Sequence, residues 1–97
     1  MTDQQATVRH DAAQQRYELL LSGQPRGVVE YREQGEQLVF THTEVDPSLS
    51  GQGMGSVLAK GALEDARRRG KRVVPQCEFI ADYVQRHNEW QGLIDPA

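Results

Sequence analysis

The chain has 97 residues, of which 37% are hydrophobic and 26% are charged, and its 11 basic and 14 acidic residues give a formal net charge of −3. This length suits one small domain, and the composition excludes an intrinsically disordered chain. The acidic balance argues against a general nucleic-acid-binding protein, which usually carries a basic excess.

The sequence carries no targeting or membrane signal. No stretch approaches the roughly 20 apolar residues of a membrane-crossing helix, and no signal-peptide pattern opens the chain. A single cysteine, Cys77, excludes an intrachain disulfide and suits a reducing compartment. We therefore expect one cytoplasmic domain over 1–97, frayed at 1–5 and 95–97, with neither a nucleic acid nor a membrane as partner.

Strand patterns fill the first half of the chain. A weak strand is expected over 6–10, and clearer ones over 16–21, 27–32 and 37–45. Short turns separate the last three, and such turns predict an antiparallel meander.

The apolar period then changes to that of a helix. Six apolar residues predict a helix over 54–69, followed by Gly70 as its C-terminal cap. They are Met54, Val57, Leu58, Ala62, Leu63 and Ala66. A strand over 71–75 closes a strand–helix–strand unit, whose two strands lie parallel. A second helix is expected to end near His87, with Trp90, Leu93 and Ile94 packed on the core. The predicted class is α+β, with a mixed, mostly antiparallel sheet and two helices.

Three glycines stand between the longest strand and the first helix. Gly51, Gly53 and Gly55 alternate with other residues just before the helical pattern begins. Glycines let the backbone approach a ligand closely, and the first turn of a helix offers unpaired N–H groups and a positive dipole end. This combination predicts a phosphate or pyrophosphate site. The alternative is a plain glycine-rich turn.

Polar residues gather at the carboxyl end of the 37–45 strand. Alternation places Leu38, Phe40, His42 and Glu44 on one face of that strand. Ligands of open α/β sheets lie beyond the carboxyl ends of strands, so His42 and Glu44 are candidate catalytic residues. A solvated surface pair is the alternative.

Cys77 follows the second strand end and precedes a helix. A helix N-terminus favours the reactive thiolate, whereas a buried structural cysteine is the alternative. Because the two strand ends are neighbours in the crossover unit, we expect His42, Glu44 and Cys77 to converge on the glycine loop. Arg86 and His87 end the second helix, where they either line a phosphate or nucleotide or are simply solvated. The ligand spacing of a metal site is missing.

Three motifs resemble those of the small, single-domain GNAT-like N-acetyltransferases. They are Thr-His-Thr-Glu-Val-Asp-Pro over 41–47, Gly-Gln-Gly-Met-Gly over 51–55 and Pro-Gln-Cys over 75–77. Phe79, Tyr83, Arg86 and His87 fit the same family, and the resemblance covers about residues 7–94. The sequence departs from the usual loop at Ser50, which stands where Gln or Arg is typical.

The resemblance implies a binding site for acetyl-CoA between the strands that end at Val45 and Pro75. The pyrophosphate would lie on the N–H groups of residues 52–56, while Val45 and Asp46 would offer backbone contacts to the pantetheine and acetyl group. The residues expected to bind acetyl-CoA are Val45, Asp46, Gly51, Gln52, Gly53, Met54, Gly55, Ser56, Arg86 and His87.

The resemblance also implies transfer of an acetyl group from acetyl-CoA to an amine, either a small amine or a protein lysine. His42 or Glu44 would take the amine proton, and Cys77 would either protonate the leaving thiolate or accept the acetyl group itself. Full-size GNAT enzymes have a last hairpin and two early helices that this sequence does not match. We therefore expect an open acceptor site or one that a partner completes. A non-catalytic acyl-CoA-binding or sensing module is the alternative function.

Overall fold

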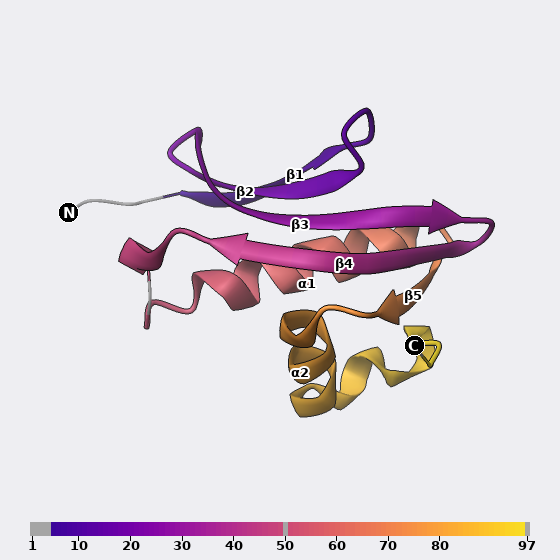
Figure 1. Cartoon of the computed structure of the whole chain (residues 1–97). Helices are drawn as coiled ribbons and strands as arrows, with labels where there is room; N and C mark the ends of the chain where they lie inside the picture. Colours follow the sequence, from indigo (N-terminus) through magenta and orange to yellow (C-terminus); the bar gives the residue numbers. More distant parts are fainter. Residues whose placement is uncertain (1–4, 50, 97) are drawn as a thin grey trace.

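The computed structural model describes residues 5–49 and 51–96. Within them, five strands form one sheet in the order β1-β2-β3-β4-β5. The strands are β1 (Ala6–Asp11), β2 (Arg16–Leu21), β3 (Gln24–Gln34), β4 (Gln37–Val45) and β5 (Arg72–Pro75). The helices are α1 (Met54–Arg68) and α2 (Glu78–Arg86), with short 3-10 helices η1 (Pro47–Leu49) and η2 (Asn88–Leu93). The predicted α+β class is confirmed (Figure 1).

The sheet is mixed, as predicted. Strands β1 to β4 pair antiparallel, and β5 lies parallel to β4 because α1 carries the chain from one end of the sheet back to the other. Strand β3 is longer than the sequence pattern predicts and includes Pro25. A register shift between Leu19 and Leu20 of β2 accompanies this proline, which has no N–H to give to the ladder.

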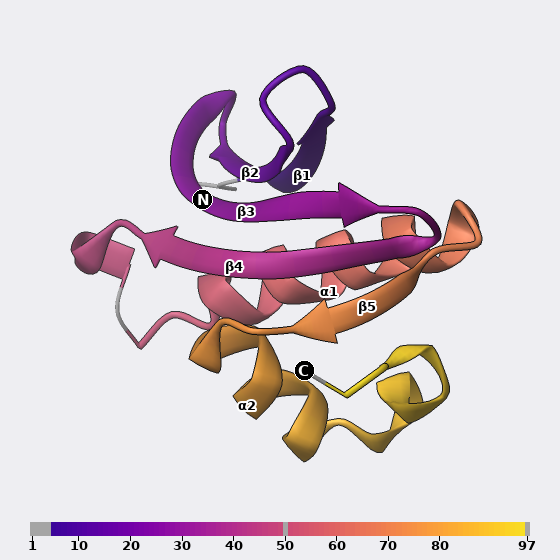
Figure 2. The same cartoon turned by 45° about the vertical axis from the view of Figure 1, so that its right-hand side comes forward.

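Helix α1 covers one face of the sheet, which we name the inner face; the opposite face is the outer face (Figures 1 and 2). Its buried side chains are Leu58, Ala59, Ala62, Leu63 and Ala66. Small residues bring the helix close to the strands: a Cβ atom on Gly61 would lie 2.5 Å from Cγ2 of Val8 in β1. None of the helices in residues 5–49 and 51–96 has the length and apolar character needed to cross a membrane.

Strand β4 contains a β-bulge at Thr41. Tyr31 of β3 lies opposite Phe40, whereas the next residue back along β3, Glu30, lies opposite His42. Thr41 is therefore the extra residue. Residues that face one another in an antiparallel pair share a face of the sheet. Phe40 thus lies on the inner face with the buried Tyr31, and His42 lies on the outer face with the exposed Glu30.

The bulge reverses the facing of the rest of β4. Thr43 lies opposite the fully buried Val29 and so belongs to the inner face, and Glu44 lies opposite Val28 on the outer face. The predicted alternation, which placed Phe40 and Glu44 on one face, is wrong for this reason. One extra residue exchanges the two faces of a strand with period 2.

Strands β4 and β5 separate halfway along β4. Their pairing ends at Phe40 and Pro75, and the last link is a hydrogen bond from the Cys77 N–H to the Phe40 carbonyl at 2.9 Å. Beyond it the chain turns into α2, while β4 continues to Val45 without β5 beside it (Figure 2). We name this separation the split.

The C-terminal segment packs back along β5. Trp90 is only 2% exposed, as predicted, and Ile94 forms a parallel bridge with Val73. We expected fraying from residue 95 onward, but the Asp95 carboxylate accepts hydrogen bonds from Arg72 at 2.7 Å and from Gln37 at 2.8 Å. Residues 1–4, for which we also expected fraying, and Ala97 lie outside the described residues.

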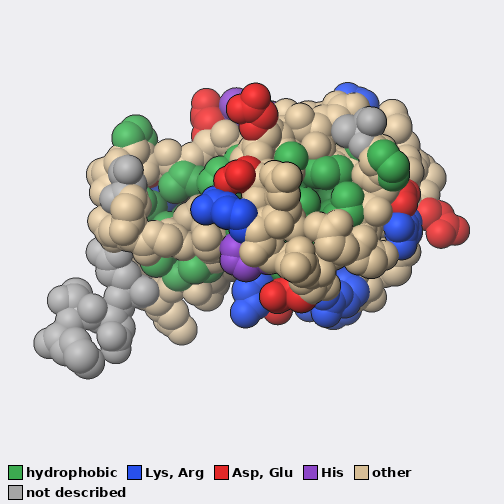
Figure 3. Space-filling view, turned by 90° about the horizontal axis from the view of Figure 1, so that it is seen from below, with side chains coloured by type: hydrophobic (Ala, Val, Ile, Leu, Met, Phe, Trp, Pro, Cys, Tyr) green, Lys and Arg blue, Asp and Glu red, His purple; other side chains and the backbone are tan. Residues whose placement is uncertain are grey.

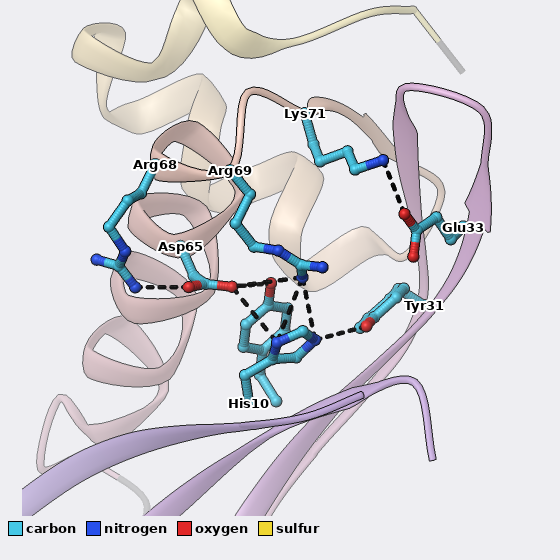
Figure 4. A network of polar contacts seen from close by, with 8 residues as sticks. His10, Tyr31, Glu33, Asp65, Arg68, Arg69 and Lys71 are labelled. Atoms are coloured by element: carbon cyan, nitrogen blue, oxygen red, sulfur yellow. Dashed lines mark hydrogen bonds and ion pairs between the residues drawn. The ribbon is translucent and has the colours of Figure 1, made fainter. Parts of the chain in front are cut away.

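A polar network joins β1, β2, β3 and the end of α1 (Figure 4). The Nε2 atom of His10 lies 2.6 Å from the Tyr31 hydroxyl, and the Tyr17 hydroxyl donates to the Asp65 carboxylate at 2.7 Å. The imidazole of His10 stacks on Tyr17 with the ring centroids 4.5 Å apart. Arg69 completes the group, with one guanidinium nitrogen 3.3 Å from the His10 ring nitrogens.

This setting disfavours the charged imidazolium. Burial and the Arg69 guanidinium lower the pKa of His10 from its ordinary 6.5, against a smaller opposing effect of the Asp65 carboxylate. The unfolded chain therefore binds a proton at His10 more readily than the folded chain does. The stability that follows from this difference is present above pH 6.5 and is lost as the pH falls below that value.

We expect His10→Gln to reduce the pH dependence of stability on the acid side of pH 6.5, because glutamine cannot titrate. The measurement is the free energy of unfolding in urea at neutral and mildly acidic pH. If the unfolding free energy depended on pH equally in wild type and His10→Gln, His10 would not be the source of that dependence.

Candidate functional site

The split exposes backbone groups of β4. The Asp46 N–H donates to the Arg26 carbonyl at 2.8 Å, so at this register the backbone points toward β3. Polar groups of an antiparallel strand alternate in direction, and those of Thr43 and Val45 therefore point away from β3 and into the split. This geometry agrees with the backbone contacts predicted for Val45.

The backbone of Asp46 is not free for the contacts with acetyl-CoA that the resemblance implies. Its N–H is already bonded to Arg26, and its carbonyl accepts from the Leu49 N–H at 2.9 Å. Its carboxylate accepts from the Ser48 N–H and from Arg26, each at 2.9 Å. Hydrogen bonds from Ser48 first, and then from Arg26, lower the pKa of Asp46. Asp46 thus fixes the turn that follows β4.

The glycine loop ends in a helix start without a side-chain cap. Gly51 and Gly53 have φ angles of 80° and 73°, a region that favours glycine. Gly53 is the N-cap of α1 and makes no side-chain cap hydrogen bond. The first helical hydrogen bond runs from the Val57 N–H to the Gly53 carbonyl. The N–H groups of Met54, Gly55 and Ser56 therefore have no partner inside the helix.

The set of predicted N–H donors needs one correction. The Gln52 N–H donates to the Leu49 carbonyl at 3.1 Å and is already bonded. Gln52 therefore leaves the predicted donor set, and the N–H groups of residues 53–56 as ligand donors stay a prediction. Ser50, where the loop departs from the usual motif, lies outside the described residues.

Gly55 has a packing role that its motif position does not reveal. A Cβ atom there would lie 2.6 Å from the ring of Phe79, which places the first turn of α1 against the start of α2. Phe79 is 39% exposed. Its ring therefore contributes to the surface beside the uncapped N-terminus of α1.

Cys77 is the N-cap of α2 and lies on the inner side of the split. Its sulfur accepts a hydrogen bond from the Ile80 N–H at 3.4 Å and lies 3.0 Å from the Thr43 hydroxyl. The residue is 8% exposed. Thr43 was not predicted as a site residue, because only the bulge at Thr41 turns its side chain toward Cys77.

His42 and Glu44 form a pair on the outer face. Their side chains are 3.3 Å apart and 53% and 74% exposed. Because Thr43 between them faces Cys77 on the inner face, the predicted convergence of all three candidate catalytic residues is wrong. The backbone of β4 separates the His42–Glu44 pair from Cys77.

Arg86 and His87 lie at the far end of α2. A nine-residue helix is about 13 Å long, so both are remote from the N-cap at Cys77. Arg86 pairs with Asp82 at 2.7 Å, and His87 stacks on Tyr83 with ring centroids 4.1 Å apart. Their predicted contact with a bound nucleotide stays a prediction.

Figure 3 looks onto α2 and the C-terminal segment from below. Hydrophobic side chains reach the surface on both sides of a central strip that carries charged and histidine side chains. No group of three or more His, Cys, Asp and Glu in the described parts of the chain is arranged to hold a metal ion. The described site residues supply N–H donors at α1 and β4, a thiol on the inner side and a carboxylate–imidazole pair on the outer side.

Known structures share this fold. An NMR structure of a GCN5-like N-acetyltransferase candidate from Staphylococcus aureus matches with a TM-score of 0.71 at 19% identity, covering 100% of this chain and 93% of that one. The crystal structure of the ribosomal-protein-S18-alanine N-acetyltransferase from Escherichia coli matches with a TM-score of 0.56 at 19% identity, covering 60% of this chain and 38% of that one.

The sequence itself matches a family model over most of its length. The model describes GCN5-related N-acetyl-transferases, and the match runs from residue 16 to residue 93. It therefore spans β2 to η2, including the split, the glycine loop and Cys77. The chain belongs to the GCN5-related N-acetyltransferase family.

Proposed function

We propose that this protein transfers the acetyl group of acetyl-CoA to a primary amine. The observation that carries the proposal is the split between β4 and β5, which leaves the polar backbone of Thr43 and Val45 without a strand partner. The first turn of α1, which has no side-chain cap, lies against Phe79 at the start of α2, where the chain leaves the split. An acyl-CoA has chemistry that matches both features, since its pantetheine arm carries amides and its pyrophosphate is an anion.

Four N–H groups would hold the pyrophosphate, those of Gly53, Met54, Gly55 and Ser56. The open space around Gly53, where a Cβ atom would meet nothing within 4 Å, leaves room for that contact. The backbone of Thr43 and Val45 would pair with the amides of the arm. This arrangement would bring the thioester to the part of β4 between the two groups of candidate catalytic side chains.

The positions of the side chains support a mechanism in which the general base acts on the outer face of β4 and the general acid acts on its inner face. Glu44 or His42 would take a proton from the amine on the outer face, a contribution of about 10²- to 10⁴-fold in rate. The Val45 N–H would stabilise the negative oxygen that forms when the amine nitrogen bonds to the carbonyl carbon, worth about 10²- to 10³-fold.

As the carbon–sulfur bond breaks, the Cys77 thiol would donate its proton to the departing thiolate from the inner side. Water then returns a proton from the outer pair to Cys77, which balances the cycle. The low exposure of the Cys77 side chain, 8%, favours this acid role over direct acceptance of the acetyl group.

We expect Gly53→Asp to weaken acetyl-CoA binding by about 100-fold or more, because a carboxylate would stand against the pyrophosphate. The measurement is the dissociation constant by calorimetry. Gly35→Asp is a matched control, since Gly35 also has a positive φ, at 60°, and open space around it. Backbone strain is thus common to both variants, and an equal affinity in the two would refute the proposed pyrophosphate site.

We expect Cys77→Ala to lower kcat by about 100-fold, because it removes the proton donor, and to leave acetyl-CoA affinity unchanged, because the proposed contacts with acetyl-CoA are backbone contacts of other residues. The measurement is release of CoA with n-butylamine and with a lysine peptide. Wild-type turnover in Cys77→Ala would exclude a role for the thiol. An acetyl adduct on wild type that Cys77→Ala lacks would replace the acid role with a covalent route. Binding without turnover of any amine by the wild type would favour the acyl-CoA-sensing alternative.

A further inference from the structure

Strand β1 forms one margin of the sheet and, within the described residues, pairs with β2 alone. The Gln5 carbonyl accepts a hydrogen bond from the Ser22 N–H at 3.0 Å and therefore points toward β2. Backbone direction alternates along an antiparallel strand, so the N–H and C=O groups of Ala6, Val8 and His10 point away from β2. These groups have the spacing that a further antiparallel strand needs for its hydrogen bonds.

A groove of about 520 Å³ lies between β1 and α1 on the inner side of this margin. Ala6, Val8 and Val57 give the groove apolar walls, and all three are only partly buried. Gly61 also lines the groove, lies against Val8 and contributes no side chain. The inner-face side chains of an added strand would cover these apolar walls, and removing apolar surface from water is favourable.

Two charged side chains of α1 line the same groove. Lys60 and Glu64 are both exposed, and neither forms an ion pair within residues 5–49 and 51–96. They are one helical turn apart and so lie on the same side of α1. Arg68, which also lines the groove, already pairs with Asp65 at 2.5 Å. A complementary partner therefore presents one negative and one positive charge in the reverse order.

A second copy of this chain meets that requirement. A two-fold axis through Val8 and perpendicular to the sheet makes β1 antiparallel to its copy, and it makes the two α1 helices antiparallel as well. Because Gly61 lies against Val8, this part of α1 is close to the axis. Lys60 of each copy then lies beside Glu64 of the other. The charge pattern of α1 is thus complementary to itself in the antiparallel orientation.

The sequence of β1 suits a pairing that is centred on Val8. In this register Val8 faces Val8 of the second copy. Ala6 faces His10, and Thr7 faces Arg9, so no like charges meet. A pairing centred on Arg9 would instead place two guanidinium groups opposite each other, and like charges in a cross-strand pair are destabilising. The side chains therefore favour the register centred on Val8.

We propose that this protein forms a two-fold symmetric dimer in which β1 pairs with β1 of a second copy and Lys60 pairs with Glu64 across the groove. The two sheets become one continuous sheet with both α1 helices on the same face. Strand β1 is separated from β4 by two strands, so the split of each copy stays open. The dimer is therefore independent of the proposed acetyl transfer.

The first test reverses charges on exposed side chains, with the dimer dissociation constant measured by sedimentation equilibrium. We expect Lys60→Glu and Glu64→Lys each to raise this constant by about 10-fold or more, because an attraction becomes a repulsion at two symmetry-related places. An equimolar mixture of the two variants should regain the wild-type affinity, since each supplies the charge that the other needs. Arg32→Glu, an exposed charge reversal on β3, is the control and should change nothing.

Three results of this test would overturn the inference. The first is a wild type that stays a monomer at about 1 mM, where even weak association is measurable. The second is a dimer whose dissociation constant neither variant changes. The third is a mixture of the variants that associates no more tightly than each variant alone.

The second test examines the register with a disulfide between Thr7→Cys and Arg9→Cys, prepared as separate proteins and mixed. Both positions are exposed. They face each other as a non-hydrogen-bonded pair, whose Cα atoms are about 4.5 Å apart, a separation that a disulfide spans. Oxidation should therefore link one copy of each variant, as measured by intact mass without reductant. The absence of this product, or equal cross-linking in either variant alone, would contradict the pairing of β1.

Discussion

The extra residue at Thr41 determines which side chains in the second half of β4 lie on each face of the sheet. Without it, Phe40, His42 and Glu44 would share the inner face, and two polar side chains would point into the apolar core beside Tyr31. With it, the polar pair turns outward and Thr43 turns inward. The bulge therefore separates the proposed proton acceptor from Cys77 and places the two on opposite faces of β4.

A second constraint acts at the same level of the sheet. Pro75 ends β5 opposite Phe40, and the chain must then turn into α2 for Cys77 to cap it. The split follows from this turn, and it begins one residue before the bulge. Both features leave the end of β4 free on its β5 side, so backbone polar groups there are available to a ligand in place of a fifth strand.

Periodicity and turn chemistry were sufficient to predict most of the fold. The apolar stripe of α1, the strand patterns and Gly70 as a helix end are local signals, and apart from the longer β3 each is found where the sequence predicts it. The bulge is not a local signal, because it depends on how β3 pairs with β4. For the same reason, the sequence could indicate that His42 and Glu44 matter but not which face they occupy.

For the glycine loop, too, local sequence signals predict only part of what the structure shows. Its motif predicts an anion site, and the uncapped start of α1 is consistent with one. Yet the reason for glycine at position 55 is the ring of Phe79, 24 residues later in the chain, and only the packing of α2 reveals it. Likewise, the engagement of the Gln52 N–H with Leu49 is a property of the folded turn.

The contacts of the C-terminal segment affect how copies of this protein can associate through the edges of their sheets. An exposed strand edge is a template on which a strand of another molecule can add. Ile94 and Asp95 occupy the outer edge of β5, where Asp95 donates its N–H to the Val73 carbonyl at 2.8 Å. Growth of the sheet from that side is therefore blocked, and β1 at the opposite margin is where strand exchange or aggregation between copies would begin.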